Sequence, residues 1–438
     1  MQNRISTGQT MIYSLPIITG GLMSFLTANY LMKYSTDILQ ISPGAMGVIF
    51  LVSRFWDAIN DPLCGYLSDH TQSRLGRRKV WILFSSLPIA VFFVMMWQSP
   101  EFLSERGKIF WMAVSVLVFF TAITALYIPH YSLGAELSED FNEHSKIFGW
   151  RAVFENMGNF LGVAVMIFLT SSLDTKKDAV YIMSVIAAAA IFLPVFMVYS
   201  LKGGETVKNK VKSNFMGEFK SVFKNVHAKI VLLTGFFTQS AAVFIMGSSL
   251  YYAQYVLKNK ETGNYIIAVF MISATIFIPL WVKISKKFGK KNIFVFSQII
   301  LSVGFFLLFF LSFMPVEFIL LLSAVMGFFG GCVLVIHPSM LADTINYDAH
   351  KTGENKEGIY FSFFTFINKT AMALAAFLIL VTLEFSGFIP NVEQTAGAAL
   401  AIRALFCLAP AVLFLAGALV LRSYRLVREE YQNKVIET

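Results

Sequence analysis

Three charged residues lie inside an apolar stretch long enough to cross a membrane, and they constrain the fold more than any other feature. The stretch is residues 43–66, and the charged residues are Arg54, Asp57 and Asp61. A charged side chain near the centre of a membrane-spanning helix costs roughly 2.5–3.5 kcal/mol. The i, i+3, i+7 spacing keeps all three within an arc of roughly 60° on one helix face. That face therefore has to meet a polar partner or a wet cavity.

The composition indicates a chain whose solvent is the lipid bilayer. Hydrophobic residues make up 56% of the 438 residues and charged residues only 14%, unlike a soluble enzyme. A spanning helix needs about 20 mainly apolar residues. We therefore predict an all-α membrane protein with twelve transmembrane helices, at residues 10–33, 43–66, 80–98, 109–133, 150–171, 178–201, 229–256, 264–282, 293–313, 316–340, 359–384 and 398–421.

The basic residues alternate between the two sides of this twelve-helix arrangement. One side holds clusters such as residues 74–79, 208–212 and 283–291, whereas the opposite loops hold few lysines and arginines. The positive-inside rule assigns the basic side to the cytoplasm. Both termini of this multi-pass protein are thus predicted to lie on the cytoplasmic side of the inner membrane, and the net charge of +9 needs no nucleic-acid partner.

The two halves of the chain carry matching motifs. Gly76 and Gly289 centre basic loops and lie 213 positions apart, and His130 and His337 begin similar segments 207 positions apart. An internal repeat of six helices is typical of transporters whose substrate site lies between the repeats. We expect an N-terminal bundle at 1–201, a cytoplasmic linker at 202–228 and a C-terminal bundle with a short tail at 229–438. The linker is interpreted either as an amphipathic surface helix or as a solvated basic connector.

The motif around these charges resembles a known family. The run from Arg54 to Pro62, the loop from Ser73 to Ile82 and the segment from Ala342 to Tyr347 closely resemble the glycoside-pentoside-hexuronide:cation symporters. This is the sodium/melibiose permease group of the major facilitator superfamily. Further similar segments are Tyr34–Asp37 and Glu357-Gly358. The resemblance implies the major facilitator fold and secondary active transport of a sugar or glycoside with Na⁺ or H⁺.

The resemblance also implies a cation site on the second helix. Its residues would be Asp57, Asn60 and Asp61, with Thr124 from the fourth helix. A cation or proton between two carboxylates offsets their repulsion, and Na⁺ prefers oxygen ligands. The alternative is structural: Asp57 and Asp61 pair with Arg54 or Lys369 and hold helices together.

For the substrate, the family pattern implies roles for Arg151 and Lys369, to which Arg54, Tyr127 and Tyr131 are added as further candidates. The sequence departs from that pattern at two sugar-binding aspartates. Gly21 stands at the first-helix position and Tyr127 at the fourth-helix position, with Tyr131 in place of a nearby tryptophan.

A cavity that loses carboxylates but keeps guanidinium and ammonium groups favours a substrate with its own negative charge, because arginine binds carboxylates through a bidentate fork. The preferred hypothesis is an acidic saccharide such as a hexuronide. The alternatives are neutral pentosides or glycosides, lipid-like substrates, and a sensor that binds a saccharide without moving it.

Several cytoplasmic-side residues are candidates for a gate or relay. His130 and His337 each lie beside a proline and could relay protons, although a hydrogen bond to a neighbouring helix that closes the proline break is the favoured interpretation. Acidic residues such as Glu136 and Asp343 could form ion pairs between the halves with Arg77 and Arg78. No nucleotide-binding motif is visible. We therefore expect coupling to an ion gradient, with no cofactor and no enzymatic reaction.

Overall fold

The computed structural model describes residues 6–137, 141–171, 176–201, 222, 224–259, 262–311, 314–352 and 357–425, and the secondary structure within these ranges is helical. The chain divides into two compact units, Met1–Asn209 and Lys210–Thr438. The two units are described one at a time. Most of the linker at 202–228, and with it the amphipathic helix considered there, lies outside the described residues.

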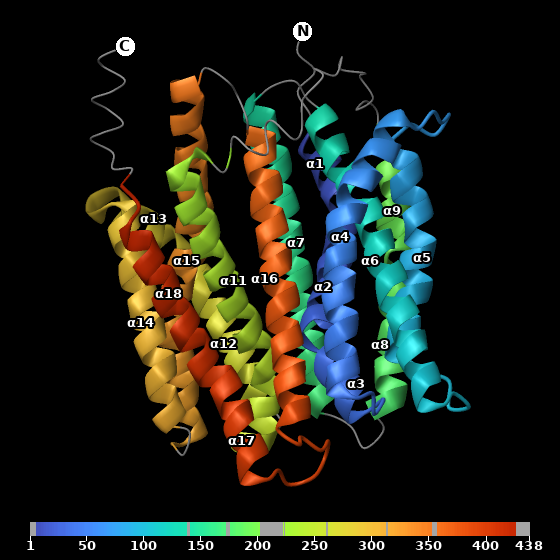
Figure 1. Cartoon of the computed structure of the whole chain (residues 1–438). Helices are drawn as coiled ribbons and strands as arrows, with labels where there is room; N and C mark the ends of the chain where they lie inside the picture. The colour runs from blue at the N-terminus through green and yellow to red at the C-terminus, as the bar shows by residue number, and fades with distance from the viewer. Residues whose placement is uncertain are drawn as a thin grey trace. The chain divides into compact units, whose positions relative to one another are not determined.

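Unit 1 begins with a span that is broken twice. Pro16 has no N–H to donate, and the first break falls beside it at Leu15; the second falls at Tyr30. The helices of unit 1 are α1 (Thr7–Ser14), α2 (Pro16–Asn29), α3 (Leu31–Asp37), α4 (Pro43–His70), α5 (Lys79–Trp97), α6 (Glu105–Glu136), α7 (Phe141–Ser171), α8 (Lys176–Ala190) and α9 (Phe192–Tyr199), and Figure 1 shows the longer ones running alongside one another.

Unit 2 contains two π-helical turns and one sharp bend. The bend of 45° separates α12 from α13 and lies beside Pro279, which lacks a backbone donor. The helices of unit 2 are α11 (Val226–Tyr251), the π-turn η1 (Tyr252–Val256), α12 (Thr262–Ile276), α13 (Ile278–Phe288), α14 (Lys290–Phe310), α15 (Val316–Thr352), α16 (Glu357–Phe385), α17 (Ala396–Arg403), the π-turn η2 (Ala404–Leu408) and α18 (Ala409–Arg422).

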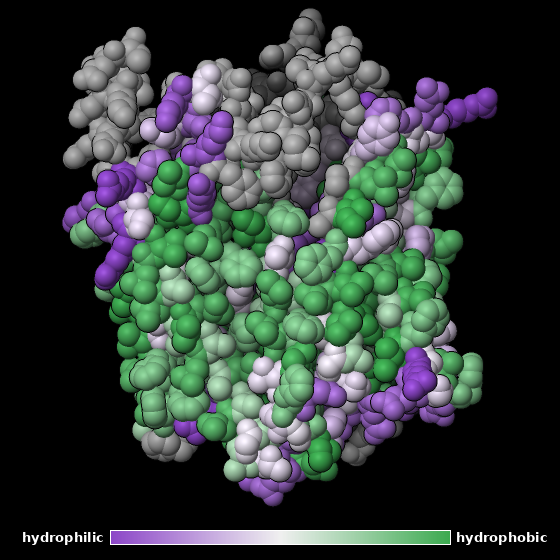
Figure 2. All heavy atoms as spheres, in the orientation of Figure 1, coloured by the Kyte–Doolittle hydropathy of each residue, from purple (hydrophilic) through white to green (hydrophobic). Residues whose placement is uncertain are grey.

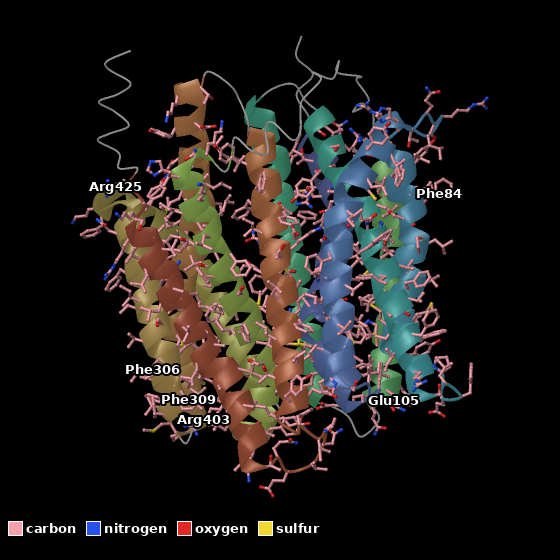
Figure 3. The ribbon with its side chains drawn as sticks, viewed as in Figure 1. Phe84, Glu105, Phe306, Phe309, Arg403 and Arg425 are labelled. Carbon is pink, nitrogen blue, oxygen red and sulfur yellow. The ribbon has the colours of Figure 1, made fainter. Side chains whose placement is uncertain are left out.

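Most of the predicted spans are long apolar helices. Among the described residues, ten helices are long and apolar enough to cross a membrane, and the bent pair α12 and α13 would make eleven. The remaining predicted span is α4, which has 28 residues and carries the charges of the second-helix motif. Large apolar side chains such as Phe84 and Phe306 are exposed and point outward from their helices (Figure 3). Hydrophobic residues cover the middle of the face drawn in Figure 2. The protein is therefore a multi-pass membrane protein.

Corresponding helices pack against each other in the two units. In unit 1, α2 packs on α7, α4 on α6, and α5 on α6 and α8; in unit 2, α11 packs on α16, α12 on α15, and α14 on α15 and α18. In span order, each unit joins its first helix to its fifth, its second to its fourth, and its third to its fourth and sixth. This is the arrangement expected from an internal six-helix repeat.

The paired glycines of the repeat both need backbone freedom. Gly76 has a φ of 97° and Gly289 a φ of 80°, in the left-handed region that side chains with a Cβ rarely adopt. The Gly76 N–H donates to the carbonyl of Ser73 at 3.1 Å, which closes the turn before α5. The two glycines identified by sequence spacing therefore both allow a positive-φ backbone conformation at equivalent positions of the repeat.

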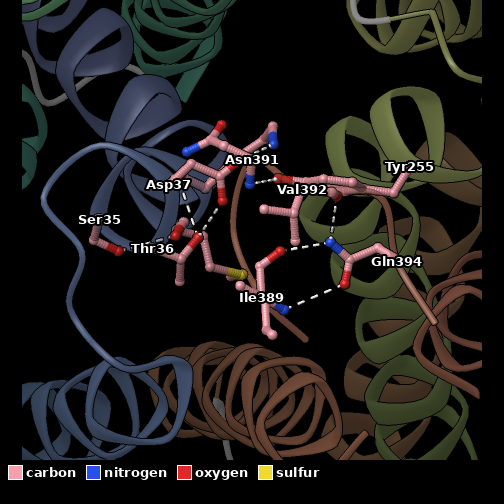
Figure 4. Close-up of polar contacts among 10 residues, drawn as sticks. Ser35, Thr36, Asp37, Tyr255, Ile389, Asn391, Val392 and Gln394 are labelled. Atoms are coloured by element: carbon pink, nitrogen blue, oxygen red, sulfur yellow. Dashed lines mark hydrogen bonds and ion pairs between the residues drawn. The ribbon is translucent and has the colours of Figure 1, made fainter. Parts of the chain in front are cut away.

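The loop between α16 and α17 is fastened to η1 in unit 2. The backbone N–H of Asn391 donates to the Tyr255 hydroxyl at 3.0 Å, and Gln394 Nε2 donates to the Val392 carbonyl at 2.9 Å (Figure 4). The exposed ion pair between Lys258 and Glu393, 2.7 Å long, adds a further link. Its hydrogen bond lowers the pKa of Glu393 and raises the pKa of Lys258.

Glycines let α2 and α7 approach each other closely. A Cβ atom at Gly158 would lie 2.1 Å from the carbonyl oxygen of Ile18, and one at Gly162 would lie 2.7 Å from the ring of Phe25. Small residues four apart are a common means of close helix packing in membranes, where lipid supplies no hydrophobic driving force. The first and fifth spans of unit 1 depend on this contact.

We predict that Gly158→Ala destabilises unit 1, because the new methyl group would collide with backbone. The expected loss is about 1–3 kcal/mol of unfolding free energy, measured as a lower thermal midpoint in detergent. Gly149→Ala is the matched control in the same helix, since a Cβ there has nothing within 4 Å. Equal midpoints for the two variants would contradict the packing argument.

Candidate cation and substrate sites

The charges of α4 are paired along the helix. Arg54 Nη1 donates to Asp57 Oδ2 at 3.2 Å, and both side chains are largely buried. The Arg54 guanidinium also lies over the ring of Phe120 on α6, 4.1 Å from its centroid. This pair lies within one helix. Its effect is to offset the Asp57 charge in a buried position.

A second carboxylate on the same face reaches the fourth span. Thr124 Oγ1 on α6 donates to Asp61 Oδ1 at 3.1 Å. Asn60 is buried, and its Nδ2 lies 3.5 Å from the carbonyl of Thr121, one turn before Thr124. These contacts bring together Asn60, Asp61 and Thr124, which are three of the four predicted cation ligands. The fourth, Asp57, lies one turn before Asp61 on α4. Carboxylate, amide and hydroxyl oxygens suit a hard cation.

The sequence reasoning did not identify Thr121. Its hydroxyl accepts from Trp56 Nε1 at 2.8 Å and donates to the carbonyl of Leu117 at 2.7 Å. Thr121 and Thr124 are three residues apart, so they share one helix face. That spacing was the available signal that α6 presents more than one polar group to α4.

Arg151 is the most deeply buried cation among the predicted substrate residues. Its side chain on α7 is 3% exposed, and its guanidinium lies 3.5 Å above the ring of Tyr131 and 5.4 Å from that of Tyr127. Nη1 donates to the Tyr131 hydroxyl at 2.6 Å. Nε and Nη2 are buried and have no hydrogen-bond partner among the described residues. The edge formed by Nε and Nη2 is one with which arginine can bind a carboxylate through two hydrogen bonds.

A carboxylate near Arg151 was missed by the sequence reasoning. Glu155 Oε2 accepts from Arg151 Nη1 at 3.1 Å. The i, i+4 spacing on a predicted helix would have revealed this pair. The expectation that only cations remain near Arg151 therefore needs adjustment, because Glu155 offsets part of the arginine charge.

The structure gives a packing reason for Gly21. A Cβ atom at this position would lie 2.7 Å from the carbonyl oxygen of Glu155 in α7. No aspartate side chain fits there without moving the two helices apart. The absence of a carboxylate at Gly21 thus follows from the close approach of α2 and α7.

The two repeat histidines hydrogen-bond to neighbouring helices, as favoured from the sequence. His130 Nε2 lies 2.7 Å from the carbonyl of Tyr13, next to the break between α1 and α2, and the Tyr13 hydroxyl donates back to the His130 carbonyl at 2.9 Å. The two rings stack 4.1 Å apart. His337 Nε2 lies 3.0 Å from the carbonyl of Val231 on α11.

The remaining predicted residues lie at several places. Arg78 is buried and donates to Ser68 Oγ at 2.7 Å, and Arg77 lies beside it in the turn before α5. Asp343 on α15 accepts from Lys290 at 2.6 Å within unit 2. The side chain of Glu136 is outside the described residues, and Lys369 lies on α16 of unit 2, partly buried. The predicted ion pairs between the halves stay a prediction.

Three comparisons relate this chain to known proteins. The family described as MFS/sugar transport protein matches residues 12–428. The uncharacterized symporter YjmB of Bacillus subtilis is 29% identical, over 99% of this chain and 95% of its own length. Sodium-dependent lysophosphatidylcholine symporter 1-A of Danio rerio is 26% identical, over 96% and 85%. The glucuronide carrier protein homolog of Escherichia coli is 22% identical, over 100% and 96%.

Solved structures resemble the fold along almost its whole length. A mutant of the nucleoside transporter NupG superposes with a TM-score of 0.71 at 14% sequence identity, covering 94% of this chain and 99% of the other. The D-xylose-proton symporter superposes with a TM-score of 0.65 at 12% identity, covering 95% of each chain. The predicted major facilitator fold is therefore confirmed.

We predict that His130→Phe destabilises the first span, because the ring keeps its place beside Tyr13 but the Tyr13 carbonyl loses its donor. An unsatisfied buried carbonyl costs about 1–3 kcal/mol, so the thermal midpoint should fall. His70→Phe is the control, since exposed His70 meets the carbonyl and the ring of Tyr66 on its own helix. A variant with unchanged stability that had lost proton-driven uptake would instead indicate a proton relay.

Proposed function

The chain belongs to the MFS/sugar transport protein family, and we propose that it is a cation-coupled symporter that carries an acidic saccharide, such as a hexuronide, across the cytoplasmic membrane. The family is one of transporters, not enzymes. In the proposed cycle, a cation binds at α4, the substrate binds at Arg151, and the two halves alternate in opening the loaded site to either side. Both chain termini would lie in the cytoplasm.

The polar face of α4 supports cation coupling. Asp57 and Asp61 are one turn apart, Arg54 pairs with the first and Thr124 with the second. A cation that joins this set would relieve the repulsion between the carboxylates and add an oxygen-rich contact between α4 and α6. Sodium is the preferred cation, since relatives that align with almost the whole chain are described as sodium-dependent symporters. Protons remain the alternative.

The single observation that carries the substrate assignment is the unpartnered edge of Arg151. Buried guanidinium nitrogens without a hydrogen bond are costly, and a substrate carboxylate would satisfy both at once. Tyr131 and Tyr127 hold the guanidinium plane in place, which preserves its fork geometry. The similarity to a glucuronide carrier homolog agrees with an acidic sugar. Lys369 is proposed as a further substrate or cation contact from unit 2.

A lipid-like substrate is the second candidate. Relatives described as lysophosphatidylcholine symporters are 25–27% identical to this chain. A phosphate group is also an anion and would fit the same edge of Arg151. Neutral pentosides or glycosides would meet that edge with hydroxyl oxygens, which accept more weakly than a carboxylate does. A sensor that binds without transport would show saturable binding and no accumulation.

The substrate prediction is tested in proteoliposomes with an inward Na⁺ gradient. We expect labelled glucuronide to accumulate, and an uncharged methyl glycoside and lysophosphatidylcholine to compete poorly. Arg151→Lys should raise the KM for glucuronide by about ten- to hundredfold, because an ammonium group cannot form the bidentate fork. Exposed Arg106→Lys is the matched control. Preferred uptake of the neutral sugar, or of the lipid, would replace the acidic-saccharide assignment.

The coupling prediction is tested in the same vesicles. We expect Asp61→Asn and Asp57→Asn to abolish stimulation by Na⁺, since each removes a charge from the proposed cation site. Glu105→Gln, at an exposed carboxylate at the start of α6, should behave like wild type. As a readout independent of transport, Na⁺ should raise the thermal midpoint of the wild type and not of the two aspartate variants. Stimulation by a proton gradient alone would assign coupling to H⁺.

A further inference from the structure

The helix α13 combines an exposed apolar turn with exposed lysines. Leu280, Lys283 and Lys287 follow one another at i, i+3 and i+7, so they lie on one face of the helix. Leu280 is 41% exposed, and both lysines are exposed. Phe288, at the end of the helix, is also exposed, and the Lys287 ammonium lies 5.4 Å from its ring centroid.

The opposite face of α13 is anchored in unit 2. Trp281 is buried, and its Nε1 donates to the carbonyl of Phe328 on α15 at 2.7 Å. The Trp281 ring also contacts the ring of Phe328, with 4.9 Å between centroids. Because the packed face is fixed and the helix is bent by 45° away from α12, the stripe of Leu280, Lys283 and Lys287 has a fixed outward direction.

Hydrophilic side chains gather at this end of unit 2. On the face drawn in Figure 2, they lie next to the apolar band, near the position that Figure 1 labels α13. The stripe therefore runs from an exposed apolar residue into a basic region. This is the composition of a segment at the boundary between acyl chains and headgroups.

Basic residues that follow Gly76 in unit 1 are used differently. Arg78 is buried and donates to Ser68, and Lys79 Nζ donates to the carbonyl of Leu201 at 2.6 Å. In unit 2, Lys290 also has a partner inside the protein, because its ammonium group pairs with Asp343. Lys283 and Lys287, by contrast, form no ion pair with any described residue. Their charges are available to a partner outside the protein.

We infer that the stripe of α13 binds the headgroup of an anionic phospholipid, such as phosphatidylglycerol, in the leaflet at the basic side of the membrane. The two lysines contact the phosphate, while Leu280 on the same face lies against the acyl chains. Free phosphate would use the lysines alone and gain nothing from Leu280. The structure therefore favours a lipid over a soluble anion.

The test measures lipid retention by the full-length protein. Purified protein is equilibrated in mixed detergent micelles with equal amounts of phosphatidylglycerol and phosphatidylcholine, and the bound lipids are quantified by mass spectrometry. We expect the wild type to be enriched in phosphatidylglycerol. Lys283→Gln and Lys287→Gln should each lower the enrichment by roughly fivefold at low salt, and 1 M salt should reduce the enrichment of the wild type.

Two further variants separate the inference from other effects. Lys283→Arg with Lys287→Arg keeps both charges and should keep the enrichment. Lys258→Gln removes an exposed lysine that follows η1 in the same unit, and should leave the enrichment unchanged. The inference is overturned if the Lys283→Gln and Lys287→Gln variants retain as much phosphatidylglycerol as Lys258→Gln does. Displacement of the lipid by millimolar inorganic phosphate would overturn the lipid assignment in favour of a soluble anion.

Discussion

Polar groups in the hydrocarbon region of a bilayer have no water to bind, so each has to be paired inside the protein. The arrangement around α4 follows from this constraint. Arg54 and Asp57 offset each other within the helix, and Asp61 reaches Thr124 on α6. The same constraint acts on the backbone, where the break beside Pro16 leaves the carbonyl of Tyr13 to be met by His130.

Arg151 departs from this rule, and the departure is informative. Nη1 is fully engaged by Tyr131 and Glu155, whereas Nε and Nη2 are buried without a partner among the described residues. Desolvated donors of a charged group are unstable unless something else meets them. A transported anion would be such a partner. Its release would leave Nε and Nη2 of Arg151 unsatisfied again, so the empty site would be less stable than the loaded one. This difference between the loaded and the empty site is what a carrier needs to couple binding to a change of conformation.

Much of the architecture could be predicted from the sequence, because apolar length and basic-residue asymmetry act locally. The family resemblance implied that Thr124 lies near the carboxylates of α4, and hydrogen bonds of the paired histidines to neighbouring helices were the favoured interpretation. Glu155 was missed although its spacing from Arg151 made it accessible. Gly21 could not be interpreted from sequence alone, since its meaning depends on the approach of α2 to the carbonyl of Glu155. Such distances arise only when two distant segments pack.

The repeat explains why the two units share a fold and why their basic residues can differ. Packing between corresponding helices and the positive φ of Gly76 and Gly289 keep the backbone alike. Side chains at the helix ends are freer, since water and headgroups can satisfy them. Arg78 turns inward to Ser68, whereas the bend beside Pro279 gives α13 a separate direction and leaves Lys283 facing outward. The basic residue Arg78 thus contributes to the packing of unit 1, whereas the lysines of α13 stay at the surface, where we propose that they meet the membrane.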